Sequence, residues 1–272
     1  MTDMLSETAH AKINLALHVR TRRPDGYHEL ETLFAFAAHG DRLTGRHADD
    51  IRLTISGPYA AKLAAEPDNL VLRAMRALQE ATGCARGARL HLEKHLPVAA
   101  GLGGGSADAA AALRLVARLW GIAPQDPAIM AVAKSLGADV PACVCSQTCH
   151  GCGRGDMLAP LHDPALAGTP VLLANPGIAL STAPVFAGWD RIDRGGFDPA
   201  RWRDGRNDLT SAAIALVPEI AEVLALLAAQ PGANFVRMSG SGASCFALFD
   251  SAEACDTAAL QIPFWHMAST IM

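Results

Sequence analysis

The chain has 272 residues, of which 50% are hydrophobic and 18% are charged, and this composition excludes a disordered protein. Its 23 basic and 27 acidic residues give a net charge of −4, so electrostatics provide no general reason to expect nucleic acid or an anionic membrane as a partner. At roughly 150 residues per domain, the length predicts one to two domains.

The cysteines and the first residues of the chain indicate the cellular compartment of the protein. The seven cysteines are odd in number and lack the spacing of a secreted disulfide framework. The first seven residues lack the basic start and apolar segment of a signal peptide. The longest apolar stretch, residues 214–229, contains Pro218, Glu219 and Glu222, which is typical of an amphipathic helix rather than a membrane span. We therefore expect a cytoplasmic protein that binds neither membrane nor nucleic acid.

Segments typical of strands and of helices alternate along the chain, which predicts an α+β protein. We expect strands at residues 11–19, 51–55, 89–93, 171–174, 235–238 and 245–249, and helices at residues 69–82, 106–119, 128–136 and 217–229. A stretch rich in proline and glycine, residues 151–176, is typical of a connection between two lobes. We place the domain boundary within it, which gives domains at residues 1–158 and 159–272.

The first segment with chemical potential is the strand at residues 11–19. Its alternation places Lys12, Asn14 and Ala16 on one face. Lys12 and Asn14 therefore point in the same direction, either into a site or, on the simpler interpretation, into solvent.

The second segment is glycine-rich, because four of the five residues from 101 to 105 are glycine and an alanine-rich helix follows. We expect Ser106 to cap that helix and Asp108 to lie in its first turn. Free backbone amides at a helix start favour an anion, most often a phosphate. The spacing fits neither a Rossmann fingerprint nor a Walker A loop. The alternative is a tight turn before a packed helix.

Two further segments are weakly specific alone. Asp139 lies between Gly137 and Pro141, where an aspartate commonly forms a turn or caps a helix. Residues 239–243 read Ser-Gly-Ser-Gly-Ala, which also fits a flexible hairpin loop.

Taken together and in this order, the four segments resemble the GHMP kinase superfamily, and within it the 4-diphosphocytidyl-2-C-methyl-D-erythritol kinases of non-mevalonate isoprenoid synthesis. The most specific match is Asp-Gly-Tyr-His-Glu-Leu at residues 25–30, and Asn-Asp-Leu at residues 207–209 adds to it. The resemblance extends from about residue 9 to residue 249. It implies the two-lobe GHMP kinase fold, with an N-terminal lobe like ribosomal protein S5, a C-terminal ferredoxin-like lobe and an active site in the cleft.

The resemblance also implies roles for individual residues. Lys12 and Asp139 match the catalytic pair. The loop that binds the ATP phosphates, called the phosphate loop below, matches Pro97, Val98, Ala99, Ala100, Gly101, Leu102, Gly103, Gly104, Gly105, Ser106 and Ala107. The positions that bind the cytidine diphosphate substrate match Asn14, Tyr27, His28, Phe186, Gly240 and Gly242.

The implied reaction transfers the γ-phosphoryl group of ATP to the 2-hydroxyl of the small-molecule substrate. Asp139 would accept or position the hydroxyl proton, and Lys12 would keep that carboxylate ionised and offset phosphoryl charge. Mg²⁺ is expected with the ATP phosphates, and Ser106 is the candidate hydroxyl ligand. Ala107 stands where the family frequently has a second serine, so one contact is removed. We expect a monomer or a homodimer.

Three alternatives remain open. Cys143, Cys145, Cys149, His150 and Cys152 form a group of five potential ligands for zinc or an iron–sulfur cluster, although their spacing is not the usual one and buried free cysteines are the simpler interpretation. A GHMP kinase for another small alcohol, such as homoserine or mevalonate, is the second. The third is a non-catalytic nucleotide-binding regulator that has kept the fold.

Overall fold

The computed structural model describes residues 4–64 and 69–272, and the contacts between residues divide the chain into two compact units. Unit 1 contains the described residues up to Ala11 and those of 40–98 and 103–146, and unit 2 contains residues 12–39, 99–102 and 147–272. Strands β1 (Leu5–Arg22) and β2 (His28–Ala48) therefore contribute residues to both units. The predicted boundary after residue 158 stays a prediction.

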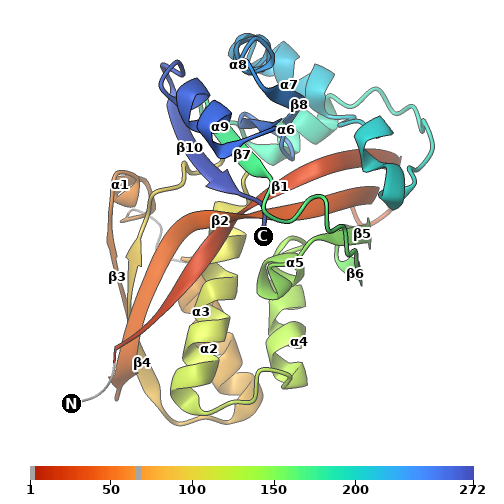
Figure 1. Cartoon of the computed structure of the whole chain (residues 1–272). Coiled ribbons are helices and arrows are strands. Elements are labelled where there is room, and N and C mark those ends of the chain that lie inside the picture. The colour runs from red at the N-terminus through yellow and green to blue at the C-terminus, as the bar shows by residue number, and fades with distance from the viewer. Residues whose placement is uncertain (1–3, 65–68) are drawn as a thin grey trace. The chain divides into compact units, whose positions relative to one another are not determined.

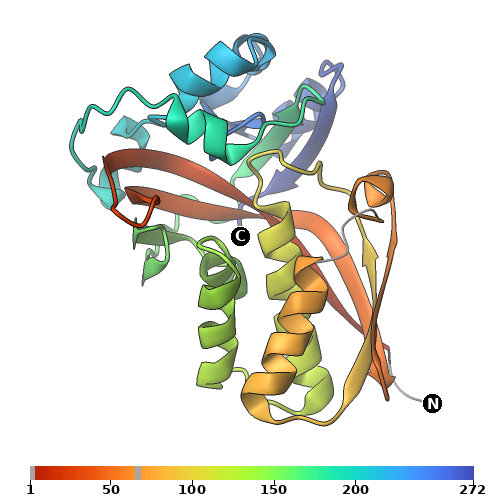
Figure 2. The same cartoon turned by 180° about the vertical axis from the view of Figure 1, so that it is seen from behind.

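Unit 1 combines strands with a group of helices (Figure 1). Strand β3 (Ile51–Ser56) pairs in parallel with β4 (Gly87–Glu93), and β4 pairs antiparallel with residues 42–48 of β2. Helix α3 (Gly104–Trp120) packs against α2 (Leu70–Thr82), α4 (Pro127–Leu136) and α5 (Val140–Cys145), as Figure 2 shows from behind. The short α1 (Ala60–Ala64) lies next to β3. Five alanines of α3, at position 107 and positions 109–112, are fully or almost fully buried, and their small side chains allow neighbouring helices to approach closely.

Unit 2 is built on a four-stranded antiparallel sheet with the order β10-β7-β9-β8. The strands are β7 (Pro170–Asn175), β8 (Ala233–Met238), β9 (Cys245–Phe249) and β10 (Trp265–Thr270). Helix α8 (Glu219–Ala228) packs against β8 and β9, and α9 (Ala252–Ala259) packs against β7 and β10 (Figure 1). All five residues of β9, Cys-Phe-Ala-Leu-Phe, are buried, which explains why this strand is apolar on both faces.

The remaining elements of unit 2 come before the strands of this sheet in the sequence or between them. Strand β5 (Cys149–Gly153) pairs antiparallel with β6 (Met157–Pro160) and with residues 30–34 of β2. Helices α6 (Thr182–Ala187) and α7 (Thr210–Leu216) pack against each other, and a 3-10 helix, η1, covers Pro199–Asp204. Residues 151–176 contain the end of β5 and all of β6 and β7, and they lie inside unit 2.

The predicted fold class is confirmed, because every predicted strand and helix overlaps an observed one. Within residues 4–64 and 69–272, no helix has both the length and the apolar composition that a membrane span requires. Cys143 and Cys145 lie in α5, whereas Cys149 and Cys152 lie in β5.

The start of α3 differs from the prediction. The helix begins at Gly104 and is preceded by Gly103 at φ 62°, so Ser106 is its third residue and does not cap it. Asp108 lies beyond the first turn and is buried beside Lys94. The prediction of both roles was wrong because glycine tolerates the left-handed conformation at the helix boundary, which let the helix begin two residues earlier.

Candidate active site

Lys12 and Asn14 lie on β1 and are only 3% and 2% exposed, so the interpretation in which they face solvent was wrong. Lys12 Nζ donates to Asn14 Oδ1 at 2.9 Å, and Asn14 Nδ2 donates to Thr32 Oγ1 at 2.7 Å. Thr32 Oγ1 in turn donates to the carbonyl of Ala16 at 2.7 Å. This directional chain fixes the orientation of the Asn14 amide, with its oxygen toward the ammonium group.

Sequence reasoning missed Thr32, which is 1% exposed on β2. Its hydroxyl accepts from Asn14 and donates to a backbone carbonyl, so both of its hydrogen-bonding functions are used. Thr32 stands between Glu31 and the apolar run of residues 33–37, and a hydroxyl at the start of such a run is the signal that could have identified it.

The first half of the phosphate loop is bound to the loop at residues 239–243. Ser239 Oγ donates to the Gly101 carbonyl at 2.9 Å and accepts from the backbone N–H of Asn14 at 3.3 Å. The Ser244 amide donates to the Ala100 carbonyl at 3.0 Å, and the Lys12 amide donates to the Leu102 carbonyl at 3.0 Å. Three predicted segments therefore meet within unit 2. Residues 239–243 form a buried, hydrogen-bonded loop that joins the antiparallel strands β8 and β9, so the hairpin interpretation is confirmed.

Glycine is required at Gly101. Its φ is 76°, and a Cβ atom there would lie 2.4 Å from the Ser239 carbonyl oxygen and 2.7 Å from that of Gly242. Gly240 also has a positive φ of 57°, and a Cβ atom on it would approach the Gly101 carbonyl to 3.1 Å. The two loops can lie this close only because neither has a side chain at these positions.

The second half of the phosphate loop is the start of α3. The Ala107 amide donates to the Gly103 carbonyl at 2.8 Å, which is the first bond of the helix. In the described part of the chain, no backbone carbonyl accepts from the amides of Gly104, Gly105 or Ser106. Three amides at the positive end of a helix dipole can bind phosphate oxygens.

Asp139 is half-buried between α4 and α5 in unit 1. It occupies the position before α5, but its side chain makes no capping hydrogen bond to that helix. The capping interpretation was therefore wrong, whereas the interpretation as a turn residue is confirmed, because residues 138 and 139 form a turn before α5. Lys12 belongs to unit 2, so the catalytic pairing of Lys12 with Asp139 stays a prediction.

Tyr27 follows a tight turn in which Gly26 has a φ of 88°. The Tyr27 amide donates to Asp25 Oδ1 at 3.1 Å, and the Arg23 amide donates to the Tyr27 carbonyl at 2.8 Å. The Arg154 guanidinium carbon lies 4.8 Å from the centroid of the Tyr27 ring, and the side chain stays 50% exposed. The turn therefore presents an aromatic ring that is supported by a cation–π contact.

His28 lies beside two aromatic rings that come from α6 and from the residues just after it. Its ring centroid is 4.8 Å from that of Phe186, and Trp189 meets it edge-on at 5.7 Å. Burial lowers the pKa of His28, and the positive charge of Arg22 lowers it further, so the ring is neutral near pH 7. The structure thus brings His28 and Phe186 together as predicted, and it adds Trp189, which the sequence reasoning missed.

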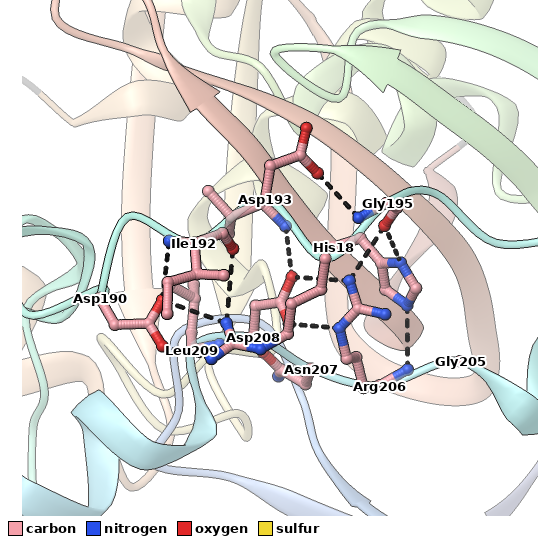
Figure 3. A network of polar contacts seen from close by, with 12 residues as sticks. His18, Asp190, Ile192, Asp193, Gly195, Gly205, Arg206, Asn207, Asp208 and Leu209 are labelled. Carbon is pink, nitrogen blue, oxygen red and sulfur yellow. Dashed lines mark hydrogen bonds and ion pairs between the residues drawn. The ribbon is translucent and has the colours of Figure 1, made fainter.

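Figure 3 shows the network around residues 206–209. Asn207 Nδ2 donates to the carbonyls of Met238 at 2.9 Å and Gly240 at 2.8 Å, so this side chain holds the loop at residues 239–243. Asp208 accepts from the Val19 amide at 2.9 Å and from Arg206 Nε at 2.6 Å. The Asn-Asp-Leu signature therefore fixes one loop of the site to the strand that carries Lys12.

His18 completes this network (Figure 3). Its Nε2 atom accepts from the Arg206 amide at 3.0 Å, and its Nδ1 atom lies 3.0 Å from the Gly195 carbonyl. Only the neutral ring with the proton on Nδ1 satisfies both contacts. Burial lowers the pKa of His18, which favours that neutral form.

Metal-binding potential is limited. Among the described residues, no three His, Cys, Asp or Glu side chains are grouped as ligands of one ion, and this applies to the cysteine-rich stretch at residues 143–152 as well. The half-buried Ser106 hydroxyl at the start of α3 offers one oxygen. Because Mg²⁺ commonly keeps several waters and binds through substrate phosphates, such sparse donors fit an ion that arrives with ATP.

Comparisons with known proteins agree with this arrangement. The family model for the N-terminal domain of GHMP kinases matches residues 69–147, and that for the GHMP kinase C-terminal domain matches residues 197–263. A protein of Rhizorhabdus wittichii named 4-diphosphocytidyl-2-C-methyl-D-erythritol kinase is 56% identical over 252 residues, which cover 90% of this chain and 86% of that protein. A protein of the same name from Novosphingobium aromaticivorans is 52% identical over 98% of this chain and 93% of its own length.

Solved structures of GHMP kinases also match this chain. A crystal structure of 4-(cytidine 5'-diphospho)-2C-methyl-D-erythritol kinase is 35% identical and superposes with a TM-score of 0.82, covering 98% of this chain and 99% of the other. A homoserine kinase from Cytophaga hutchinsonii has a TM-score of 0.70 over 100% of this chain and 96% of its own. At 19% identity, that second likeness shows the fold alone.

Proposed function

This chain belongs to the 4-diphosphocytidyl-2-C-methyl-D-erythritol kinase family of GHMP kinases, and we propose that it phosphorylates the 2-hydroxyl of 4-(cytidine 5'-diphospho)-2-C-methyl-D-erythritol with ATP. The products are the 2-phosphate and ADP, within the methylerythritol phosphate route to isoprenoids. The observation that carries the proposal is the 56% identity to a kinase of that name over 90% of this chain.

Phosphoryl transfer requires alignment and charge neutralisation more than covalent chemistry, and the described residues meet these needs. Lys12 is held by a buried chain of hydrogen bonds, which supports its role as a fixed positive charge. Asp139 lies within the stretch that matches the N-terminal domain of GHMP kinases, which supports its role as the group that accepts or positions the hydroxyl proton. The amides of residues 104–106 would hold phosphate oxygens.

Base recognition is proposed for Tyr27, His28 and Phe186. The half-exposed Tyr27 ring, with Arg154 against it, offers a face on which a pyrimidine could stack. A neutral His28 has one donor and one acceptor nitrogen, so it can hydrogen-bond to the edge of cytosine. Asn14, Gly240 and Gly242 would line the remaining substrate site. A substrate that lacks the base would lose all three aromatic contacts.

ATP is the co-substrate of this kinase family, and Mg²⁺ bound to its phosphates would neutralise their charge. Ser106 is the residue we propose to contact that ion. Residues 97–107 would surround the phosphates through their backbone, because the loop offers almost no polar side chains.

We further propose that the enzyme acts in the cytoplasm, as a monomer or a homodimer, and that it does not bind nucleic acid. The net charge of −4 supports the last point. The anionic substrates would be bound by local amides and Lys12 rather than by a basic surface.

The test combines an acceptor panel with one substitution. Wild-type protein is incubated with ATP, Mg²⁺ and the cytidine diphosphate compound, homoserine or mevalonate, and ADP release is measured. We expect turnover only with the first acceptor. Asp139→Asn should lower kcat by at least about a thousandfold while ATP binding persists. Asp126→Asn is the matched control, since it makes the same change at the other end of α4 and asparagine still caps that helix.

Two outcomes would contradict the proposal. Efficient turnover of homoserine or mevalonate would assign a different acceptor, and full activity of Asp139→Asn would remove Asp139 from the chemistry. ATP binding without turnover of any acceptor would support the non-catalytic regulator instead.

A further inference from the structure

Four consecutive carbonyls of the phosphate loop, those of residues 99–102, accept hydrogen bonds from separate segments of unit 2. The Leu180 amide donates to the Ala99 carbonyl at 3.1 Å, and the Ser244 amide donates to the Ala100 carbonyl at 3.0 Å. The next two carbonyls also accept hydrogen bonds within unit 2. This half of the loop is therefore held along the side that carries its carbonyl groups.

The direction of these carbonyls sets the direction of the amides that follow them. The peptide bonds at residues 99–103 are trans, and in a trans peptide the N–H group points away from the C=O group. Each amide of residues 100–103 therefore points away from the segment that binds the carbonyl before it. In the described part of the chain, no backbone carbonyl accepts from these amides. They are free to bind phosphate oxygens together with the amides at the start of α3.

Asn175, the last residue of β7, joins two of the segments that bind the loop. Its side chain is buried, with 1% exposed. Nδ2 donates to Ser244 Oγ at 2.9 Å, and Oδ1 accepts from the Gly177 amide at 2.8 Å. One end of this amide group thus holds the residue that binds Ala100, and the other end holds the segment that leads to Leu180.

The Ala99 carbonyl belongs to a residue that needs such support. Ala99 has a φ of 54°, a left-handed conformation that is costly for a residue with a Cβ atom. Its side chain is exposed, so packing does not hold this conformation. The hydrogen bond from the Leu180 amide is therefore a contact that helps to maintain it.

The two segments that Asn175 joins also contact each other. Thr182 Oγ1 lies 3.1 Å from Ser241 Oγ, within hydrogen-bonding distance. A Cβ atom on Gly242 would lie 3.4 Å from Leu180 Cδ2, so the Leu180 side chain lies next to this glycine. Asn175 is therefore the buried link between two segments that lie side by side.

We propose that Asn175 is a positioning residue for ATP, which acts by holding the segments that bind the carbonyls of Ala99 and Ala100. The proposal rests on the proposed function of the phosphate loop. Asn175 acts through Ser244 and Gly177, because its own side chain is buried and both of its polar groups are used. Without this side chain the two carbonyls lose their fixed partners, and the amides that follow them are no longer held toward the phosphates.

The first test is Asn175→Ala, which removes both hydrogen bonds. The dissociation constant for ATP with Mg²⁺ is measured by calorimetry, and KM for ATP and for the cytidine diphosphate acceptor by steady-state kinetics, at a temperature well below unfolding. We expect the dissociation constant and KM for ATP to rise about tenfold, the effect of losing roughly one hydrogen bond in the bound state. KM for the acceptor should change less, because Tyr27 and His28 are held by other contacts. A merely structural role would not separate the two KM values.

Ser244→Ala tests the same link from its other end. It removes the hydroxyl that accepts from Asn175 Nδ2 and keeps the backbone amide that binds the Ala100 carbonyl. We expect ATP to bind about threefold more weakly than to the wild type. In the double variant, Ser244→Ala should add less than a factor of about two to the effect of Asn175→Ala, because the hydrogen bond is already absent. Ser244→Ala also provides the test if Asn175→Ala does not fold.

Val171→Ala is the matched structural control, because Val171 is fully buried near the other end of β7. We expect it to lower the Tm and to leave the dissociation constant for ATP within about twofold of the wild type. Unchanged ATP affinity in Asn175→Ala and Ser244→Ala, an equal weakening in Val171→Ala, or additive effects in the double variant would overturn the inference and leave the proposed function intact. Absence of ATP binding by the wild type would contradict the proposed function as well.

Discussion

Asn207 offers a sharp test of how unit 2 holds its part of the site. Its side chain is 9% exposed and makes three hydrogen bonds, two as donor to the carbonyls of Met238 and Gly240 and one as acceptor from the Leu209 amide at 3.0 Å. Asn207→Ala removes all three and leaves two carbonyls and one amide without this partner. The loop at residues 239–243 then loses its attachment to residues 206–209.

The magnitude follows from these contacts. Loss of a buried hydrogen-bond partner costs about 1–3 kcal/mol, and partial access of water to the new space reduces the sum, so we expect about 3 kcal/mol of lost stability. For a chain of this size that corresponds to a decrease in Tm of roughly 6–12 °C. A typical domain is stable by about 5–15 kcal/mol, so the variant should still fold.

Kinetics at a temperature well below unfolding separate stability from function. We expect Asn207→Ala to lower kcat/KM for the cytidine diphosphate acceptor by at least about tenfold, because Gly240 is no longer held beside Gly101. Asn234→Ala is the matched control, since Asn234 is exposed and its side chain bonds to Asp250 on the surface. A lowered Tm with unchanged kcat/KM would refute the argument that Asn207 acts through the loop.

Two further predictions concern the strand that carries Lys12. Thr32→Val removes the acceptor for Asn14 Nδ2 at nearly constant volume, so we expect kcat to decrease about tenfold while Thr32→Ser, which keeps the hydroxyl, retains most activity; steady-state kinetics measure both. His18 has a lowered pKa, so the unfolded chain binds its proton more readily than the folded chain, and the free energy of unfolding should decrease as the pH falls below about 6.5. Urea unfolding at several pH values tests this: the decrease should be smaller in His18→Gln, and an equal slope in both proteins would contradict the neutral ring that binds the Arg206 amide.

The helices and strands could be predicted because the spacing of apolar residues and the positions of glycines determine them over short stretches of sequence. Helix 128–136, for example, is observed at Pro127–Leu136 with Asp126 as its cap. The start of α3 was misplaced because Gly103 takes the left-handed conformation directly before the helix, and a run of four glycines does not specify which of them does so. Thr32 and Trp189 were missed because their roles depend on the neighbouring strand and on the ring of His28.

For the site residues too, part of the arrangement could be predicted from the sequence and part could not. Lys12, Asn14, Gly101 and the loop at residues 239–243 were expected together, and the hydrogen bonds of unit 2 bring them together. The solvent-facing alternative for Lys12 was reasonable for an isolated lysine, because burial of an ammonium group requires partners that the sequence alone does not reveal. Only the presence of all the segments in one chain made the buried interpretation the better one.

The phosphate loop is a continuous segment that is fixed by two independent sets of contacts. The carbonyls of Ala100 and Gly101 accept hydrogen bonds from Ser244 and Ser239 in unit 2, whereas residues 104–107 form the first turn of α3 in unit 1. The positive φ values of 76° at Gly101 and 62° at Gly103 occur where the chain passes from one set to the other. Glycine is needed there because the backbone must make both sets of contacts within three residues. We therefore expect that the loss of either set changes the conformation of the loop. Asn207→Ala should therefore affect nucleotide binding as well, because the loop that Asn207 holds is hydrogen-bonded to the carbonyls of Ala100 and Gly101.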